Sequence, residues 1–402
     1  MFWGAHVVSR IGTQMRDVAI AWHMYALTGS PLALGLLGAA RFFPIFVLAL
    51  AGGVAADAFD RRRLMIVTQS VLTFTAAMMA LLSAGGVVSA GALYGLLGVS
   101  AAAAAFDNPA RHSLVVNLLP DEDVPNGLAL GIFGWQLATV TGPAIGGVLL
   151  AITSVEVIYA IDAISFLAVI GALLVVRPRK PAADAPPAPR AELRLGSALE
   201  AVRYLRTRPV LIWLMIADFL ATFFAGSMQL LPIFAREVFR VGAEGYGLLT
   251  AAPAAGAVAA SVWLSARAPI RRQGFAVLGA IAVYGVSVAA FGLTTSFWLA
   301  LVLLAISGAA DTVSTVVRQV VRQLHTPDAL RGRMTAVNMI FFVGGPQLGE
   351  VEAGVVARLT TPRLSVVSGG VACVLVAGVV ALLAPALRRL EREETQAAAP
   401  AG

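Results

Sequence analysis

The sequence predicts an all-α integral membrane protein, with twelve spanning helices arranged in two pseudo-symmetric halves of six. Three observations predict this fold: an apolar composition, twelve long apolar segments, and short motifs that recur about 200 residues apart. Of the 402 residues, 59% are hydrophobic and 13% are charged, and the mean hydropathy is +0.84. A chain of this length has more apolar surface than one water-soluble core can bury, so a bilayer must cover the rest.

A bilayer-spanning helix needs roughly 20 mostly apolar residues. The segments that meet this requirement are 2–27, 31–56, 64–84, 90–107, 126–152, 157–176, 209–233, 244–267, 272–293, 297–317, 333–357 and 364–386. The first segment is not a removable signal peptide, because Arg10, Arg16 and Asp17 interrupt it and no small-residue cleavage site follows.

Basic residues set the predicted orientation. On this segmentation, 22 of the 29 Lys and Arg residues fall in cytoplasmic connections or the C-terminal tail, and only 4 fall in outer connections. The positive-inside rule therefore places both termini in the cytoplasm of a multi-pass protein of the cell (plasma) membrane. The net charge of +7 reflects this topology and not a nucleic-acid partner, since no basic stripe with interleaved aromatic residues is present.

The longest polar stretch divides six segments from six. The predicted organisation is an N-terminal half at 1–176, a cytoplasmic linker at 177–208, a C-terminal half at 209–387 and a cytoplasmic tail at 388–402. The linker begins with a Pro/Ala-rich stretch that predicts flexibility. Its later part predicts an amphipathic helix on the inner leaflet, from the apolar residues Leu195, Leu199, Val202 and Leu205. We interpret this helix as a structural tie between the halves.

The two halves share short motifs at equivalent places. Val115–Leu119, followed by Pro120, corresponds to Val320–Leu324, followed by Pro327. Inside the fifth segment of each half, Gly142-Pro143 corresponds to Gly345-Pro346. Two repeated halves with a substrate site between them near the membrane midplane form a design that permits alternating access.

The connection between the second and third segments carries a gating motif. Gly53 to Leu64 resembles the loop between helices 2 and 3 of the major facilitator superfamily, Gly-x-Leu-Ala-Asp-Arg-x-Gly-Arg-Lys-x-Leu. The matching residues are Gly53, Ala56, Asp57, Arg61, Arg62 and Leu64, whereas Ala58 and Asp60 depart from the pattern. The expected role is a cytoplasmic gate: Asp57 accepts from the N-terminal end of helix 11, and Arg61 or Arg62 binds neighbouring acids. The alternative is a solvated charge run that ends a helix.

The fifth segment contains a second motif. Gly142, Pro143, Gly146 and Gly147 match the Gly-Pro-x-x-Gly-Gly core of the superfamily's antiporter motif, with Ala138 in place of its leading glycine. Glycine permits a close helix approach and Pro143 bends the helix. The alternative is ordinary small-residue packing, since the chain has 39 glycines. Together with the gating motif, the segment favours an exporter over an importer.

In finer detail the chain resembles the drug and siderophore exporters of this superfamily, the enterobactin-exporter-like branch. The segments that carry the resemblance are Tyr25–Ser30, Asn108–Arg111, Leu231–Glu237 and Gly344–Gly354. The connection between the eighth and ninth segments has Arg267, Arg271 and Arg272 but no Asp, so the Asp57 motif is not duplicated.

Ionisable residues within the spanning segments are the candidates for proton coupling and for the cavity. A charge there costs several kcal/mol unless it faces water or a partner. Asp17 and Arg41 lie at similar depth and can form an ion pair, which makes Asp17 the first candidate. The acids of the second half are Asp218, Asp311, Glu350 and Glu352.

Only one of the last two acids can face a central cavity, because residues two apart on a helix point about 200° away from each other. We prefer Glu350, which is nearer to mid-span, and rank it second after Asp17; Asp218 and Glu350 have no obvious cationic partner in the sequence. The family resemblance implies that helices 1, 2, 4, 5, 7, 8, 10 and 11 line the cavity, and these acids lie on that set. The alternative is that the acids form fixed interhelical pairs, and Asp162 is interpreted as structural.

The residue pattern indicates neither an enzyme nor a cofactor. Cys373 is the single cysteine, the four histidines lack metal-ligand spacing, and no Gly-x-x-x-x-Gly-Lys loop accompanies the only lysine, Lys180. We therefore expect no catalytic residues, no metal site and an ion gradient as the energy source, with H⁺ preferred to Na⁺.

The predicted function is proton-coupled efflux of small amphipathic compounds, drug-like or siderophore-like, with a role in multidrug resistance or siderophore export. The expected partners are the small-molecule substrate, protons and the lipid bilayer, and the expected state is a monomer. The alternatives are a facilitator or importer of the same fold and, from another class, a transport-inactive membrane receptor or a lipid-modifying enzyme.

Overall fold

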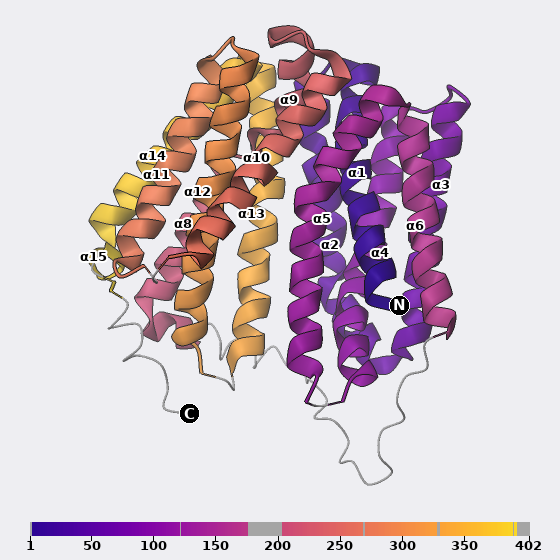
Figure 1. The fold of residues 1–402 in the computed structure, drawn as a ribbon, viewed down its shortest axis with the longest axis horizontal. Helices are drawn as coiled ribbons and strands as arrows, with labels where there is room; N and C mark the ends of the chain where they lie inside the picture. Colours follow the sequence, from indigo (N-terminus) through magenta and orange to yellow (C-terminus); the bar gives the residue numbers. More distant parts are fainter. Residues whose placement is uncertain are drawn as a thin grey trace. The chain divides into compact units, whose positions relative to one another are not determined.

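The computed structural model describes residues 2–120, 122–175, 203–267, 270–327, 330–388 and 390–391. Their regular secondary structure is helical, and the described part contains no strand. The long helices are α1 (Phe2–Thr28), α2 (Pro31–Ala58), α3 (Arg61–Ala84), α4 (Ala90–Leu118), α5 (Val124–Ile152), α6 (Val155–Val175), α8 (Pro209–Phe224), α10 (Gly242–Ser265), α11 (Gln273–Leu293), α12 (Phe297–Leu324), α13 (Arg331–Leu359) and α14 (Pro362–Leu383) (Figure 1). Two short ones are α9 (Leu231–Ile233) and α15 (Pro385–Arg388).

Ten segments of the described part are long and apolar enough to cross a bilayer. The long helices α1 and α13 are not among them. Arg10, Arg16 and Asp17 lower the apolar character of α1, as Glu350 and Glu352 lower that of α13. The predicted count of twelve spans therefore stays a prediction, whereas the all-helical membrane fold is confirmed.

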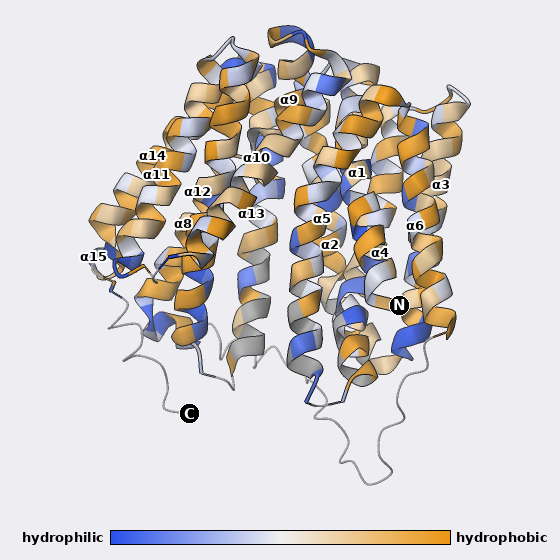
Figure 2. Ribbon diagram, viewed as in Figure 1, coloured by the Kyte–Doolittle hydropathy of each residue, from blue (hydrophilic) through white to orange (hydrophobic). Residues whose placement is uncertain are grey.

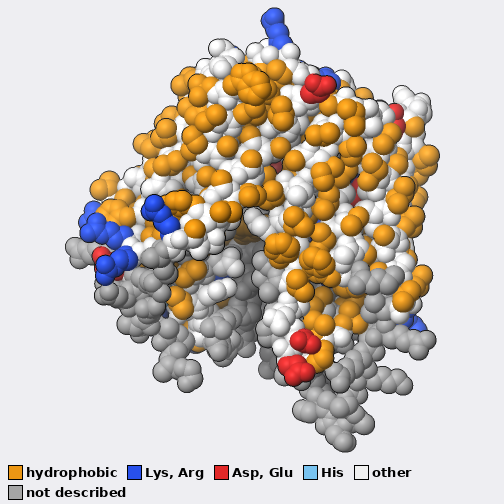
Figure 3. Space-filling model, viewed as in Figure 1, with side chains coloured by type: hydrophobic (Ala, Val, Ile, Leu, Met, Phe, Trp, Pro, Cys, Tyr) orange, Lys and Arg blue, Asp and Glu red, His pale blue; other side chains and the backbone are white. Residues whose placement is uncertain are grey.

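Large apolar side chains are exposed along the helices. Phe46, Leu81, Trp298 and Leu382 are 58%, 68%, 73% and 78% exposed. Hydrophobic residues run along most of each helix in Figure 2, and in Figure 3 they cover much of the visible surface. Apolar exposure on this scale is typical of a surface that contacts lipid.

Most predicted segment bounds lie within three residues of the helix bounds. Three helices are exceptions. α8 ends before its predicted bound, and α4 and α12, which were predicted to end at 107 and 317, continue to Leu118 and Leu324. The last turns of α4 and α12 carry Arg111 and Arg318, which lower hydropathy but do not interrupt backbone hydrogen bonding. Hydropathy therefore located the apolar part of these two helices and missed their polar ends.

The predicted span 209–233 is not one continuous helix. α8 ends at Phe224 and is followed by a 3₁₀ turn, by α9 and by a π turn at Phe234–Val238. Two residues explain the break. A Cβ at Gly226 would lie 2.8 Å from the Gly349 Cα, so the chain passes close to α13, and Pro232 has no N–H to continue the ladder.

The described helices fall into two compact units. Unit 1 comprises residues 1–29, 40–193 and 242–247, and unit 2 comprises residues 30–39, 194–241 and 248–402. Unit 1 thus includes the first turn of α10, and unit 2 includes the first turns of α2. The predicted domain boundaries at 176 and 209 stay a prediction.

The same helix pairing occurs within each unit. In unit 1, α1 packs against α5 and α6, and α3 packs against α4 and α6. In unit 2, α8 packs against α13 and α14, and α11 packs against α12 and α14. Each of these helices in unit 1 thus has a counterpart in unit 2, in chain order. The helices α1, α3, α4, α5 and α6 correspond to α8, α11, α12, α13 and α14.

The apolar core of unit 2 draws on residues far apart in the chain. Leu205 at one end and Leu387 and Leu390 at the other belong to one buried cluster. Most of the predicted linker helix lies outside the described residues. In its described part, 203–207, the backbone is helical, and the Tyr204 hydroxyl donates to the His325 carbonyl oxygen.

Candidate functional site

Four charged side chains form a chain of ion pairs among α1, α2 and α6 of unit 1. Arg16 Nη1 lies 3.0 Å from Asp162 Oδ2, and Arg16 Nη2 lies 3.7 Å from Asp17 Oδ1. Arg41 Nη2 lies 3.5 Å from the same Asp17 oxygen. The predicted pair of Asp17 and Arg41 is therefore present, and it is part of a longer series in which acid and base alternate.

Burial differs along this series. The Asp162 side chain is fully buried and the Arg16 side chain is 5% exposed, whereas the Asp17 side chain is 31% exposed. Thr13 Oγ1 donates to Asp162 Oδ1 over 3.4 Å. Gly12 brings α1 close to α6 here, since a Cβ at this position would lie 3.0 Å from Asp162 Oδ1. Of the two acids, Asp17 therefore has the more exposed side chain.

A second buried ion pair joins α8 and α12 in unit 2. Arg318 Nη2 lies 2.7 Å from Asp218 Oδ1, with side chains 10% and 9% exposed. Arg318 also donates to Ser314 Oγ and Thr315 Oγ1, each over 3.0 Å. The sequence showed no obvious cationic partner for Asp218, and the structure has Arg318 in that place. From the sequence, Arg318 was counted with a cytoplasmic connection because α12 was predicted to end one residue before it.

The other acids of the second half lie in different surroundings. Asp311 is exposed on α12, and Glu352 is half-buried on α13. Glu350 is also half-buried, and a Cβ at Gly38 would lie 2.8 Å from its Oε2 atom. The Glu350 carboxylate therefore lies against the first turns of α2, within unit 2.

The glycines of the antiporter motif are sites of close helix contact in α5. A Cβ at Gly142 would overlap Gln14 of α1, and one at Gly146 would lie 2.9 Å from the Met15 Cα. A Cβ at Gly147 would overlap the backbone of Gly247 on α10, also in unit 1. Pro143 lies inside α5 between these contacts. These three positions therefore have no space for a side chain.

The corresponding helix of unit 2 has the same arrangement. A Cβ at Gly345 would overlap the Thr222 side chain of α8, and one at Gly349 would overlap the backbone of Phe223. A Cβ at Gly354 would lie 2.7 Å from the Gly35 Cα on α2. In each unit, therefore, one helix has two glycines that contact the same neighbouring helix. A third glycine of that helix lies against a glycine of a different helix.

The predicted gating residues lie where α2 ends and α3 begins. Gly53 and Asp57 are in the last turns of α2, and the Asp57 side chain lies outside the described residues. Arg61 Nε donates to the Ala56 carbonyl oxygen over 3.5 Å. The side chain of Asp60, which departs from the family pattern, accepts from the Arg63 N–H over 2.8 Å and so caps α3.

Arg62 contacts the end of a different helix. Its Nε and Nη2 atoms donate to the Leu173 and Leu174 carbonyl oxygens, over 2.6 and 2.8 Å. From the sequence, Arg61 or Arg62 was expected to bind neighbouring acids. In the described part, the hydrogen bonds of both arginines are instead to backbone carbonyl oxygens, and those of Arg62 are at the C-terminal end of α6, where the helix dipole favours a cation.

Comparison with known proteins identifies the family. The model of a family described as transmembrane secretion effector matches residues 1–401. The chain belongs to this family, which is part of the major facilitator superfamily. The enterobactin exporter EntS of Citrobacter koseri is 27% identical over 397 residues, which cover 96% of this chain and 92% of the relative. EntS of Escherichia coli is 26% identical over 407 residues, which cover 99% and 94%.

Solved structures agree in fold with this superfamily. A bacterial homologue of the human lysosomal transporter Spinster has a TM-score of 0.76 at 15% identity and covers 97% of each chain. The xylose transporter XylE of E. coli has a TM-score of 0.67 at 13% identity and covers 98% of each chain. A bacterial homologue of the iron transporter ferroportin has a TM-score of 0.67 at 14% identity and covers 94% of this chain and 97% of the other.

Two polar features of this superfamily member were missed from the sequence. One is Arg16, which connects Asp162 to Asp17 and was noted only as an interruption of an apolar segment. The other is Asp107 on α4, which is 1% exposed, pairs with Arg111 and accepts from Thr68 over 2.8 Å and from Gln69 over 2.9 Å. The four-residue spacing of Asp107 and Arg111 could have indicated this pair.

Proposed function

We propose that the chain is a secondary active transporter that exports small amphipathic compounds by H⁺ antiport with alternating access. In this proposal twelve spanning helices form two six-helix halves, 1–176 and 209–387, with both termini and the linker in the cytoplasm. The direction of transport is supported by the EntS relatives, which are exporters and match over nearly the whole chain. The helix pairing that recurs in the two units supports the two-fold design.

The proposed cargo is siderophore-like or drug-like, and enterobactin is the first compound to test. The named function of the relatives supports this choice. At 26–27% identity a cargo can differ between relatives, so a panel is needed. Ligand-dependent stabilisation of the purified protein across enterobactin, other siderophores, antibiotics and dyes identifies the class that binds.

The observation that carries the coupling proposal is the ion pair between Asp17 and Arg41. The Asp17 side chain is the more exposed of the two acids in the chain of ion pairs, and two guanidinium groups lie within 4 Å of its carboxylate. A neighbouring cation favours the charged form of a carboxyl and removal from water favours the neutral form. A conformational change that alters these surroundings of Asp17 is the proposed link between proton binding and transport.

The proposed exchange involves Asp17 and the cations on either side of it. With Asp17 ionised, the four charges of the series sum to zero, and Arg41 is held by α1. When Asp17 takes up a proton, the ionic attraction between Asp17 and Arg41 is lost, while Arg16 keeps Asp162. Protonation thereby weakens the attraction between α1 and α2 at this depth and leaves the packing of α1 against α6 in place. Release of the proton on the opposite side restores the pair.

Transport by reconstituted vesicles tests the proposal. Asp17→Asn is expected to abolish uphill efflux driven by a pH gradient and to preserve downhill exchange of substrate. The matched control is Glu122→Gln, at an exposed acid outside the spanning segments. If Asp17→Asn keeps full pH-driven transport and Glu350→Gln loses it, the coupling site lies on α13. If both variants keep it, either the coupling ion or the export proposal is wrong.

A further inference from the structure

The described residues after α14, 384–388 and 390–391, pack into unit 2. α14 ends at Leu383, and Pro385 starts the short helix α15. Leu387 is fully buried and Leu390 is 4% exposed. The Gly274 N–H on α11 donates to the Leu390 carbonyl oxygen over 3.2 Å. These contacts fix the chain around α15 against the first turn of α11.

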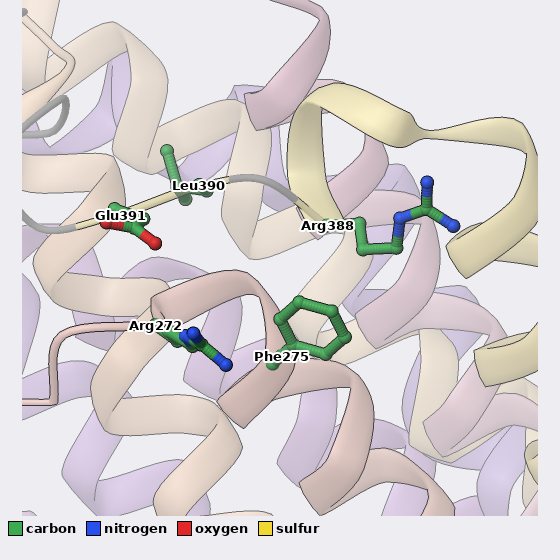
Figure 4. A pocket seen from close by; sticks show the side chains of 5 residues that line it. All are labelled: Arg272, Phe275, Arg388, Leu390 and Glu391. Atoms are coloured by element: carbon green, nitrogen blue, oxygen red, sulfur yellow. The ribbon is translucent and has the colours of Figure 1, made fainter.

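A hollow of about 350 Å³ lies at this junction. Arg272, which precedes α11, and Phe275 in its first turn form one side, and Arg388, Leu390 and Glu391 form the other (Figure 4). The lining therefore combines two guanidinium groups, one carboxylate and an apolar part. Two of these charged residues, Arg388 and Glu391, flank the anchored Leu390, so their backbone positions are fixed by the core.

The hollow lies at the end of membrane-spanning helices. α11 is a candidate span from its first residue, Gln273, and α14 is one up to Leu383. The Phe275 side chain is 55% exposed beside the hollow. In Figure 3, basic side chains gather where Figure 1 places α15. A polar lining at the end of a spanning helix, next to an exposed aromatic side chain, is typical of the boundary between lipid headgroups and acyl chains.

We propose that this hollow binds the headgroup of an anionic phospholipid that carries a hydroxyl group, of the phosphatidylglycerol type. Arg272 and Arg388 bind the phosphodiester, because guanidinium groups donate to phosphate oxygens in bidentate geometry. Glu391 accepts a hydrogen bond from a headgroup hydroxyl, and Phe275 contacts the first methylene groups of an acyl chain. This inference needs only that the chain spans a membrane and does not depend on the export proposal.

Charge supports one monoanionic lipid in the hollow. The lining carries two positive charges and one negative charge, so a single phosphodiester neutralises it. Glu391 opposes a second phosphate, which argues against a multiply charged headgroup. Inorganic phosphate can bind the two arginines in the same way but has no acyl chain. A comparison of its binding with that of phosphatidylglycerol therefore shows whether the hollow binds a lipid or a free phosphate.

Lipid titration tests the site. The full chain is placed in nanodiscs of phosphatidylcholine with increasing phosphatidylglycerol, and bound lipid is counted by native mass spectrometry. Arg272→Gln and Arg388→Gln are each expected to weaken binding roughly fivefold, from the known effect of one surface cation on anionic lipid. Arg388→Lys keeps the charge and is expected to recover most of the binding.

The matched control is Arg267→Gln. Arg267 lies in the same connection, but its guanidinium stacks 4.7 Å from the Trp263 ring centroid and does not line the hollow. Phosphatidylmethanol, which has the same charge and no headgroup hydroxyl, tests Glu391. The unmodified protein is expected to prefer phosphatidylglycerol, and Glu391→Ala is expected to remove the preference.

Four results would overturn the inference. They are unchanged binding in both Arg272→Gln and Arg388→Gln, an equal loss in Arg267→Gln, equal retention of phosphatidylethanolamine, and displacement of the lipid by equimolar inorganic phosphate. The second would indicate general surface attraction, and the last would indicate an ion site. Each variant replaces a charged side chain near the protein surface. The unfolding temperature of each variant without added lipid shows whether its fold is intact.

Discussion

Arg16 on α1 and Asp162 on α6 form an ion pair of 3.0 Å whose side chains are almost entirely removed from solvent. Removal of one partner of such a pair takes away the closest counter-charge of the other, and breaking a buried pair in this way costs about 3–5 kcal/mol. Removal of both leaves Asp17 paired with Arg41 and restores the balance of charge. The pair therefore makes a specific prediction about the stability of unit 1.

Asp162→Asn and Arg16→Gln are each expected to lower the thermal unfolding midpoint strongly, and the double variant is expected to lose less than the sum of the two. The measurement is thermal unfolding of all three variants in detergent, analysed as a double-mutant cycle. Thr13→Val removes no charge: it takes away the 3.4 Å hydrogen bond to Asp162 and the 3.1 Å hydrogen bond to the Ser9 carbonyl oxygen, and it is the mild control. Additive losses would mean that the two charges act independently.

Leucine at the glycines of α5 is expected to reduce transport by disturbing helix packing. Gly142→Leu and Gly146→Leu place a side chain where the structure has α1, so the cost is overpacking of at least about 1–3 kcal/mol. Transport should fall while the set of compounds that bind stays the same. The matched control is Gly171→Leu on α6, where a Cβ meets no atom within 4 Å. Tolerance of leucine at both motif positions would show that this face of α5 contacts lipid.

Arg62 is expected to stabilise the end of α6. Arg62→Gln removes donors to two carbonyl oxygens at the helix C-terminus, with an expected loss of about 1–2 kcal/mol. Hydrogen exchange of the last turn of α6 measures this loss. Arg63→Gln, at a neighbouring exposed arginine, is the control. Equal exchange in both variants would contradict the anchoring role.

Asp57→Asn is expected to weaken the outward-open state and reduce transport without preventing membrane insertion, because the gate role needs a full negative charge. Efflux at matched expression levels measures the effect. Asp60→Asn is a close control, since Asn can also cap α3 while the local charge changes equally. Unchanged efflux in Asp57→Asn would exclude the gate role.

The sequence predicted the apolar part of the fold well because bilayer thickness sets helix length. It predicted the ends less well. α4 and α12 continue past their apolar residues, and α8 stops at a close contact between Gly226 and Gly349 that hydropathy does not report. A hydropathy pattern reports burial in lipid, whereas helix ends depend on backbone hydrogen bonds and on neighbouring helices.

The candidate site was predicted in part. Depth along the helices suggested that Asp17 could pair with Arg41, and the structure has this pair. The partner of Asp218 was missed, because Arg318 lies one residue beyond the predicted end of its segment. Arg16 was missed for a different reason: a pattern on one helix does not show which neighbouring helix, here α6 with Asp162, supplies the partner.

The burial of Leu390 in the same cluster as Leu205 has a consequence for the order of events during synthesis. A ribosome adds about 5–20 residues per second, so roughly 10–40 s separate the appearance of these two leucines. A cluster of unit 1 that joins Ala56, Met65, Leu114 and Leu173 has, among the described residues, no member beyond the last of these. That cluster can therefore close while translation continues, whereas the core of unit 2 has to wait in the membrane, incomplete, until Leu390 has emerged.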